Sequence, residues 1–455
     1  MSDFKKQSQK IAFDLKHRKT IKFNMSRYET AVERGKKQYT NLDLAKKRAS
    51  YIKEKAVYNL YNYIQEFEKN FIANGGKIIW AENTSQAIKN IIDILQTKQA
   101  KMVVKSKSMT TEEIEFNKAL ENNNIESVET DLGEYIVQLA GEKPYHIVTP
   151  AMHKSKQDVA DLFNKKFNTP ENSTPEFLTL FVRDILRKKF VNADVGVTGG
   201  NFLIADVGGV AVTENEGNAL MSTSFPKTHI AIVGIEKIIP SINDFYTMWP
   251  ILATHGTGQN ITAYNSIFTG PKKENEPDGP EEMYVILLDN GRADLLNNQE
   301  QNEVLKCIRC GACLNACPVY RNIGGYTYNA TYSGPIGSVI TPHYKGMEKY
   351  KHLSFACTLC GKCTEVCPEK INLHHLLILN RRDAVENTKT SMLWDLGMKA
   401  YEKGMLNRNL MDIAGGGIKN FGAKLFGKKL WGPYRDLPKV AKQSFSKQWK
   451  KQQKK

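Results

Sequence analysis

The sequence has no cysteine outside one stretch, because all eight cysteines of its 455 residues lie between positions 307 and 367. It also lacks any run of about eighteen apolar residues, the length that a membrane-spanning helix requires. Its first residues, MSDFKKQSQK, are polar and contain no apolar signal-peptide segment. We therefore expect a cytoplasmic protein without a transmembrane segment, in a compartment that keeps thiols reduced. Peripheral association with the inner membrane surface is the alternative.

Common nucleotide-binding motifs are missing as well. No G-x4-G-K-[ST] loop is present, and no G-x-G-x-x-G follows the first expected strand. These absences argue against helicase-type machinery and against nucleotide binding of the dehydrogenase type.

Acidic residues are scarce at the ends of the chain, and the formal net charge of the whole chain is +16. Residues 5–37 are rich in lysine and arginine, and residues 419–455 contain twelve basic residues but the single acid Asp436. Such a charge suits nucleic acid, an anionic membrane or an acidic protein partner. Terminal charge runs are most often solvated arms, and we expect that here rather than nucleic-acid binding. Docking to a protein is the alternative.

The cysteines form two copies of one pattern, C-x2-C-x2-C-x3-C-P. The copies are Cys307, Cys310, Cys313 and Cys317 with Pro318, and Cys357, Cys360, Cys363 and Cys367 with Pro368. This spacing is typical of [4Fe–4S] clusters, because three closely spaced thiolates let a tight loop enclose one cube. Zinc sites more often present two cysteine pairs with a spacer, and disulfides are not expected in a reducing compartment. The sequence therefore predicts two [4Fe–4S] clusters and electron transfer.

The fourth cysteine of this pattern ligates the other cluster in two-cluster ferredoxins. We therefore predict one cluster on Cys307, Cys310, Cys313 and Cys367, and a second on Cys357, Cys360, Cys363 and Cys317. The segment between the two runs is long and rich in tyrosine, which favours helices packed around the clusters. Its tyrosines either shield the clusters from water or form a docking face for a redox partner.

Strand and helix patterns alternate in the first part of the chain. A long amphipathic helix is expected over 42–73; further helices over 85–95, 110–122, 156–167 and 175–190; and strands at 77–81, 102–105, 126–132, within 195–218, and at 229–235 and 283–288. Such alternation predicts an α/β fold with a parallel sheet covered by helices. We expect four parts: a basic arm over 1–41, an α/β domain over 42–296, an all-α ferredoxin-type domain over 297–385, and a helical basic extension over 386–455.

Two short segments carry candidate site residues. Lys105, Ser106 and Ser108 lie where an expected strand opens into a helix, which is where anions bind in open α/β sheets. The alternative for this segment is a plain helix start, with Thr110 and Glu113 forming a capping box.

The second segment contains Glu216, Lys227 and His229. A lysine could pair with the carboxylate of a 2-hydroxy acid, and a histidine could accept its proton. His229 could instead be a structural histidine at the start of a strand. Arg292, which follows a later strand, either belongs to a turn or binds an anion or a carboxylate of the cysteine-rich part.

Several longer phrases resemble the lactate utilisation protein B family of bacterial iron–sulfur proteins. They include VVKSKSMTTEEI at 103–114, TENEGN at 213–218, DNGR at 289–292, both cysteine runs, and WGPYRDLPKVAKQSF at 431–445. The resemblance implies a lactate-utilisation (LUD) domain of the open-sheet type found in sugar-phosphate isomerases (NagB/RpiA) and CoA transferases. It also implies an α-helical ferredoxin domain, companion subunits A and C, and a role in converting L-lactate to pyruvate.

We favour an electron-transfer subunit of a multi-protein system that oxidises L-lactate. A second hypothesis makes the LUD domain itself the catalytic site, with Lys105, Glu216, Lys227 and His229 as candidates and the clusters as electron sink. A third is an iron–sulfur redox adaptor that serves a substrate other than lactate. No motif indicates the electron acceptor.

Overall fold

The computed structural model describes residues 2–389, 392–413, 415–427 and 436–454. It contains two compact units, Met1–Glu386 and Asn387–Lys455. The helices of the second unit are α21 (Met392–Leu406), α22 (Arg408–Ile413), α23 (Gly416–Gly422), the π-helical turn η5 (Ala423–Gly427) and α25 (Phe445–Gln453). Residues 431–435, which begin the last phrase of the resemblance, lie outside the described residues. None of the described helices is both long and apolar enough to cross a bilayer.

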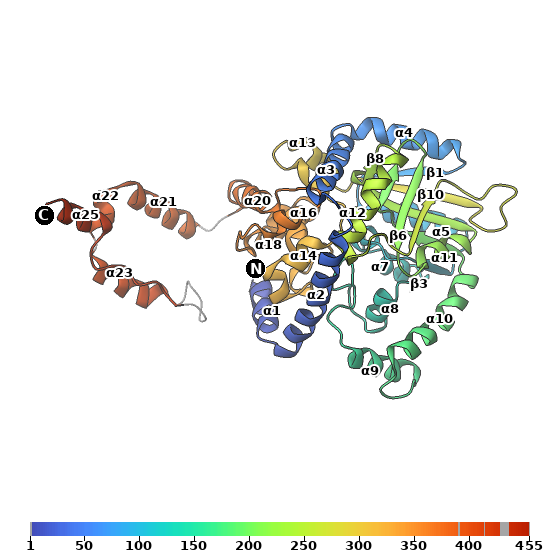
Figure 1. The fold of residues 1–455 in the computed structure, drawn as a ribbon, viewed down its shortest axis with the longest axis horizontal. Helices are drawn as coiled ribbons and strands as arrows, with labels where there is room; N and C mark the ends of the chain where they lie inside the picture. Colours follow the sequence, from blue (N-terminus) through green and yellow to red (C-terminus); the bar gives the residue numbers. More distant parts are fainter. Residues whose placement is uncertain (1, 390–391, 414, 428–435, 455) are drawn as a thin grey trace. The chain divides into compact units, whose positions relative to one another are not determined.

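A six-stranded sheet forms the centre of the first unit (Figure 1). Its strands, in spatial order, are β1 (Lys77–Ala81), β10 (Glu282–Leu288), β7 (Thr228–Gly234), β4 (Val195–Thr198), β2 (Met102–Lys105) and β3 (Glu126–Glu129). Every pairing is parallel, and β7 is buried along its whole length. A parallel sheet with helices on both faces requires such apolar strands. The prediction of an α/β fold with a parallel sheet is confirmed.

A second sheet lies within the same part of the chain. Its order is β8 (Ile238–Ile239), β5 (Phe202–Ile204), β6 (Gly209–Glu214) and β9 (Tyr264–Phe268). The glycine-rich segment predicted as consecutive strands thus supplies β4 to the first sheet and β5 and β6 to the second. Gly208, at the turn between β5 and β6, has φ +60°, and a Cβ there would lie 2.3 Å from the backbone nitrogen of Phe71. Only glycine fits this close approach.

Helices cover both sheets. They are α3 (Leu42–Tyr58), α4 (Leu60–Ala73), α5 (Thr84–Thr97), α6 (Met109–Glu113), α7 (Phe116–Asn122), α8 (Leu132–Leu139), α9 (Lys156–Phe167), α10 (Pro175–Asn192), α11 (Asn218–Ser224), α12 (Phe245–Thr257) and α13 (Arg292–Asn297), with the 3-10 turns η1 (Ile235–Lys237) and η2 (Ile242–Asp244). Residues 42–297 are called the α/β part below.

Three predicted elements differ in the structure. The single helix expected over 42–73 is two helices that meet at Asn59, whose φ of −114° is not helical. The helix expected over 110–122 is interrupted at Glu115, whose backbone is left-handed with φ 55°. The strand expected over 126–132 ends at Glu129, because Asp131 caps α8 by accepting a hydrogen bond from the backbone of Glu134.

The regular structure described in the cysteine-rich part consists of helices and 3-10 turns joined by loops (Figure 1). Its elements are η3 (Asn302–Lys306), α14 (Ala312–Ala316), α15 (Pro318–Ile323), η4 (Tyr326–Tyr328), α16 (Gly334–Lys345), α17 (Met347–Tyr350), α18 (His352–Phe355), α19 (Lys362–Val366) and α20 (Leu373–Asn387). Residues 302–387 are called the helical part below. Tyr328 and Tyr332, in its insert, are buried in the same hydrophobic cluster as four of the cysteines.

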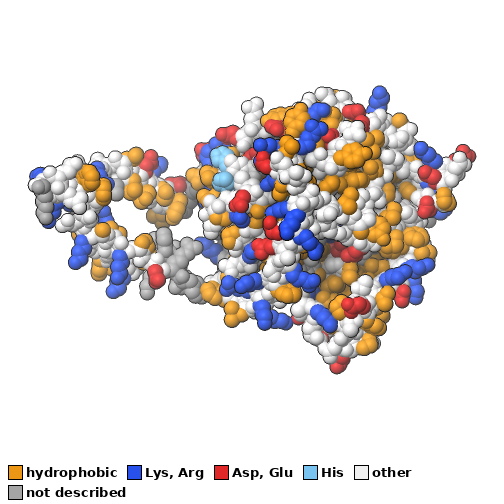
Figure 2. Space-filling view, viewed as in Figure 1, with side chains coloured by type: hydrophobic (Ala, Val, Ile, Leu, Met, Phe, Trp, Pro, Cys, Tyr) orange, Lys and Arg blue, Asp and Glu red, His pale blue; other side chains and the backbone are white. Residues whose placement is uncertain are grey.

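The N-terminal residues do not form a solvated arm, so that expectation was wrong for α1 (Ser2–Ala12) and α2 (Leu15–Lys36). Ile21 and Met25 of α2 are buried, and the Tyr28 hydroxyl lies 2.5 Å from Thr149 Oγ1. These positions repeat at intervals of four and three and give a basic helix one apolar stripe. The stripe faces the protein, while many Lys and Arg side chains remain on the outer face where α1 and α2 lie (Figure 2).

A buried charge network joins the α/β part to the helical part. Arg292 donates to Glu113 Oε2 at 2.9 Å and to Glu236 Oε2 at 2.5 Å. Its guanidinium lies 4.7 Å from the ring centroid of Tyr344, and the Tyr332 hydroxyl donates to Glu113 at 2.6 Å. Burial would raise the pKa of Glu113, but Arg292 holds that pKa below its ordinary value.

The capping box predicted at Thr110 and Glu113 is therefore wrong. Ser108 caps α6 by accepting a hydrogen bond from the backbone of Thr111. The carboxylate of Glu113 does not cap the helix backbone, because it binds the fully charged guanidinium of Arg292, which is a stronger partner. Arg292 binds two carboxylates, but both belong to the α/β part, so the predicted alternative of a carboxylate from the cysteine-rich part is wrong.

Replacing Arg292 with leucine is expected to destabilise the protein by about 3 to 5 kcal/mol, because two buried carboxylates lose their cation. The thermal unfolding midpoint measures the effect. Arg382→Leu, which removes the half-exposed ion pair with Glu300, serves as the control and should cost about 0 to 1 kcal/mol. Equal midpoints for the two variants would show that the network contributes little.

Candidate functional site

Four cysteines from the two runs line one small cavity in the helical part. They are Cys307, Cys310, Cys313 and Cys367, and the cavity is called the cysteine cavity below. Burial raises the pKa of the Cys367 thiol to about 12, and the proximity of Cys307 contributes to the shift. This is the set that the exchanged fourth ligand predicts for one cluster.

The other four cysteines also lie close together. Burial raises the pKa of the Cys317 thiol, and the neighbouring thiolates of Cys357 and Cys360 raise it further. Burial and the proximity of Cys357 and Cys317 raise the pKa of Cys363 to about 11. The assignment of individual ligands remains a prediction, and the chemistry of both donor sets suits a [4Fe–4S] cube.

The two cysteine runs have the same backbone conformation. Arg309 and Leu359 occupy equivalent positions with left-handed φ of 59° and 54°. The backbone N–H of each donates to the sulfur of the cysteine two residues earlier, at 3.4 Å to Cys307 and 3.3 Å to Cys357. Loops of this kind turn N–H groups toward sulfur, as cluster binding requires.

A second, larger cavity lies in the α/β part, at the carboxyl ends of β2, β3 and β4. It has a volume of about 320 Å³ and is called the sheet-end cavity below. The chain runs outward from β2 to β3 and then returns to place β4 on the other side of β2. This reversal is the place where open α/β sheets bind ligands.

Three cations line the sheet-end cavity: Lys107, Lys237 and Arg309. Lys107 donates to the carbonyl of Val148 at 2.7 Å and lies 3.8 Å from Asp131. Lys237 is buried, and burial together with the charge of Arg309 lowers its pKa to about 7. Arg309 stacks on Tyr332, with its guanidinium carbon 4.9 Å from the ring centroid.

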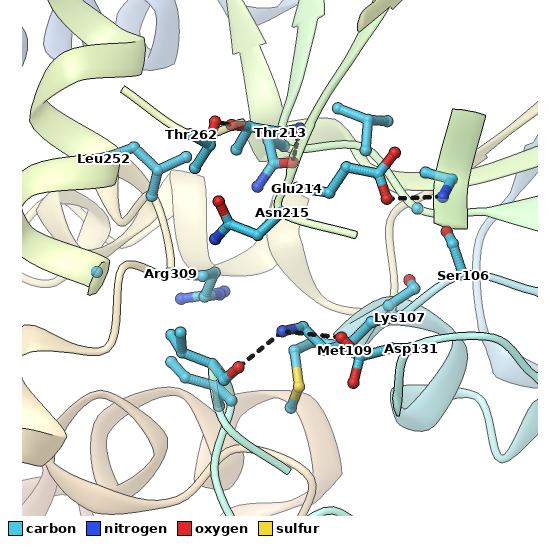
Figure 3. A pocket seen from close by; sticks show the side chains of 18 of the residues that line it. Ser106, Lys107, Met109, Asp131, Thr213, Glu214, Asn215, Leu252, Thr262 and Arg309 are labelled. Carbon is cyan, nitrogen blue, oxygen red and sulfur yellow. Dashed lines mark hydrogen bonds and ion pairs between the residues drawn. The ribbon is translucent and has the colours of Figure 1, made fainter. Parts of the chain in front are cut away.

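Carboxylates and amides line other walls of the cavity (Figure 3). Glu214 accepts hydrogen bonds from the backbone of Ala219 and Leu220 at the start of α11. Glu216 accepts one from the backbone of Leu132 at 2.9 Å. Glu216 has an exposed surface, but its surroundings desolvate the carboxylate. This desolvation, together with the charge of Asp131, raises the pKa of Glu216 to about 7.

The sequence candidates separate into two groups. Glu216, Ser106 and Ser108 line the sheet-end cavity, whereas Lys105, Lys227 and His229 do not. The ammonium of Lys105 is buried 2.9 Å from Glu129, and three glutamates, led by Glu129, raise its pKa in spite of burial.

The other two candidates outside the cavity have simpler environments. Lys227 has an 80% exposed side chain and pairs with Glu281. His229 is buried in β7, lies 2.8 Å from Thr198 Oγ1, and packs edge-on against Phe268.

Sequence reasoning missed Lys107, Lys237, Arg309 and Asp131. Lys107 lies between the site candidates Ser106 and Ser108, and Arg309 lies inside the first cysteine run. Position-by-position comparison of the two runs would have found Arg309, because Leu359 stands at its equivalent. Only the folded chain brings Lys237, from η1, to the same cavity.

The two cavities share part of their walls. Arg309 and Cys310 line both the sheet-end cavity and the cysteine cavity. A molecule bound at the sheet end would therefore lie against a cysteine of the first cluster set.

Comparison with known proteins defines the class. The LUD domain model matches residues 64–288, and the 4Fe-4S dicluster domain model matches residues 303–371. The protein is an iron–sulfur protein with a LUD domain and a dicluster domain, and the prediction of two [4Fe–4S] clusters is confirmed.

The curated relatives define the family. The chain is 44% identical to Lactate utilization protein B of Bacillus velezensis over 364 residues, covering 80% of this chain and 76% of the relative. It is 39% identical to the protein of the same name from Shouchella clausii over 463 residues, covering 99% and 97%. The chain belongs to the lactate utilization protein B family.

One solved structure also aligns with the chain. It is a DUF162 family protein from Deinococcus radiodurans, with 11% identity and a TM-score of 0.29, covering 50% of this chain and 98% of that one. This likeness is too weak to support an argument about fold or function.

The environment of His229 predicts a pH effect on stability. Burial lowers its pKa from 6.5 to about 3, so the folded protein binds fewer protons than the unfolded chain between these values. Stability therefore falls as the pH drops below about 6.5, by about 1.4 kcal/mol per pH unit from this residue. In His229→Gln this loss should be absent.

Thermal unfolding midpoints from about pH 7.5 to about pH 5.5 measure the effect as a slope. The absolute stability of the variant does not matter for this comparison. His375→Gln, at an exposed position, is the control and should keep the wild-type slope. An unchanged slope in His229→Gln would contradict the buried, neutral imidazole.

Proposed function

We propose that the protein transfers electrons in a multi-subunit system that oxidises L-lactate to pyruvate, passing them through its two [4Fe–4S] clusters. The observation that carries the proposal is the grouping of the eight cysteines into two sets, one of which lines the cysteine cavity. The relatives are named Lactate utilization protein B, and this name supports the choice of lactate.

We assign one cluster to Cys307, Cys310, Cys313 and Cys367, and the other to Cys357, Cys360, Cys363 and Cys317. The composition of the cysteine cavity supports the first set, and the mutual effects on thiol pKa support the second. Exchange of the fourth ligand would hold the cubes close enough for electron transfer between them.

The exposure of the cysteines supports a direction for the electrons. Cys310 and Cys313 of the first set are buried, whereas Cys360 of the second set is exposed. Electrons would then enter at the first cluster, beside the sheet-end cavity, and leave from the second cluster near the surface. Companion subunits A and C of the family are the proposed partners; the acceptor is a separate redox protein or cofactor.

The cellular setting and the fold lineage are proposed on separate grounds. A cytoplasmic location suits cluster assembly, which needs reduced thiols. The open parallel sheet, with a cavity at its carboxyl edge, is consistent with the sugar-phosphate isomerase and CoA-transferase lineage.

A second candidate function makes the LUD domain the substrate site. The shared Arg309–Cys310 wall favours it, because a substrate in the sheet-end cavity would need no other protein to reach a cluster. Of the four catalytic candidates taken from the sequence, Glu216 is the one that lines this cavity.

Replacing Cys317 with serine should disturb the cluster whose other ligands are Cys357, Cys360 and Cys363, because its fourth thiolate is removed. Electron paramagnetic resonance (EPR) of the dithionite-reduced protein measures this. The signal lost in Cys317→Ser should match that lost in Cys363→Ser, and the signal lost in Cys313→Ser should remain. Loss of the Cys313-dependent signal alone would contradict the exchanged assignment.

Anaerobic EPR with L-lactate tests the function itself. Lactate is added first to the protein alone and then together with the companion subunits. Reduced-cluster signals that require the companions would support the electron-transfer proposal, and signals with lactate alone would support the LUD domain as the substrate site. No signal in either case, with dithionite still reducing the clusters, would overturn the lactate assignment.

A further inference from the structure

We propose that the sheet-end cavity binds a small carboxylate, a 2-hydroxy acid or its 2-oxo product, through Arg309 and Lys237. The inference rests on the proposed function for the choice of acid, and goes beyond it by assigning the binding residues. These residues lie on different elements, since Arg309 belongs to the first cysteine run and Lys237 to η1.

Arg309 is a buried cation whose hydrogen bonds are incomplete. Its side chain is 9% exposed, and its Nη1 has no hydrogen-bond partner among the described residues. Its Nη2 reaches Glu236 Oε1 only at 3.4 Å, while the other oxygen of that carboxylate, Oε2, accepts from Arg292 at 2.5 Å. A desolvated guanidinium with a free N–H edge favours an anion, and carboxylate geometry matches it in two parallel hydrogen bonds.

The second cysteine run shows that the loop does not need this charge. Leu359 occupies the equivalent position with the same left-handed backbone and the same N–H to sulfur hydrogen bond. The backbone of the loop therefore does not require a guanidinium at this position, although Arg309 also lies close enough to Cys307 for their charges to interact. The feature that distinguishes the first loop is that it forms part of the sheet-end cavity.

Lys237 adds a second amine beside Arg309, and a bound anion would favour its protonated form. The residue is 8% exposed, and no hydrogen bond joins its Nζ to another residue in the described part of the chain. Lys107, by contrast, already has Val148 and Asp131 as partners. Among the cations that line the cavity, Arg309 and Lys237 are therefore the two whose hydrogen bonding is incomplete, and Arg309 is next to Cys310.

Polar groups on the facing walls suit the rest of such a ligand. In Figure 3, Arg309 and Asn215 border the same open space, and Lys107 with Asp131 borders it from another side. A carboxylate can accept a hydrogen bond from the hydroxyl group of a hydroxy acid, and an amide N–H can donate to the carbonyl oxygen of an oxo acid. The volume of about 320 Å³ is more than enough to hold a three-carbon acid.

The test measures binding to the cluster-loaded protein under anaerobic conditions. The probes are L-lactate, pyruvate and lactamide, the neutral amide of lactate. Titration calorimetry gives affinity, and EPR of the dithionite-reduced clusters reports whether the bound molecule perturbs one of them. We expect both acids to bind and to alter one cluster signal, and lactamide to bind at least about tenfold more weakly, because it lacks the charge.

Arg309→Leu is the decisive variant, because it gives the first loop the residue that the second loop already has. It should retain both clusters and bind the acids about ten- to a hundredfold more weakly, as expected for a lost charged hydrogen bond. Lys227→Gln removes an exposed lysine of the same domain and should bind as the wild type does. Unchanged affinity in cluster-loaded Arg309→Leu would overturn the assignment, even if the cluster potential changed, because the cation would then serve the cluster alone.

Lys237→Gln carries the test if Arg309→Leu does not load its clusters, and unchanged affinity in that variant overturns the proposal. So does a failure of both acids to bind the loaded wild type. The proposed function has a separate test. If lactate reduces the clusters through the companions but no acid binds here, only this inference fails; if the acids bind here but lactate never reduces the clusters, only the proposed function fails.

Discussion

The buried position of Arg292 between Glu113 and Glu236 is the constraint on which the rest of the site depends. Glu113 also accepts a hydrogen bond from Tyr332, and Arg292 lies against the ring of Tyr344, so α6, η1, α13 and the tyrosine-rich insert meet at one point. Arg292 binds one oxygen of Glu236, and Arg309 approaches the other at 3.4 Å while its Nη1 has no partner among the described residues. The network therefore fixes the insert against the sheet beside an arginine of the sheet-end cavity. Buried ion pairs add little net stability, because the cost of desolvating the charges offsets most of their attraction. They nevertheless define which segments meet.

Much of the fold could be predicted from local sequence because the patterns are local. The strands at 77–81 and 102–105 are short apolar runs, and α9 matches the helix that the sequence pattern predicted over 156–167. Errors arose where a distant partner decided the outcome. Glu113 looked like a capping residue until Arg292, far along the chain, supplied a stronger interaction. The basic N-terminal segment looked solvated because its charge obscured a sparse stripe that includes Ile21 and Met25.

The site was predictable only where sequence spacing itself defines the chemistry. Cysteine spacing predicted the two clusters, since a tight loop brings nearby thiolates together without help from the rest of the fold. The sheet-end cavity has no such signature, because its residues come from β-strand ends, η1 and a cysteine loop. Lys105 and His229 were selected for their chemical type, and the fold places both in interior contacts with partners of their own. Residue type alone could not distinguish a buried structural charge from one that faces a ligand.

The composition of the cysteine cavity has a consequence for biosynthesis. Its fourth cysteine, Cys367, comes from the end of the second run, after the whole tyrosine-rich insert. Under the proposed ligand assignment, a ribosome must complete the insert and reach Cys363 before the second set of four thiols exists, and Cys367 before the first set exists. Neither cube could then be completed on the first run alone.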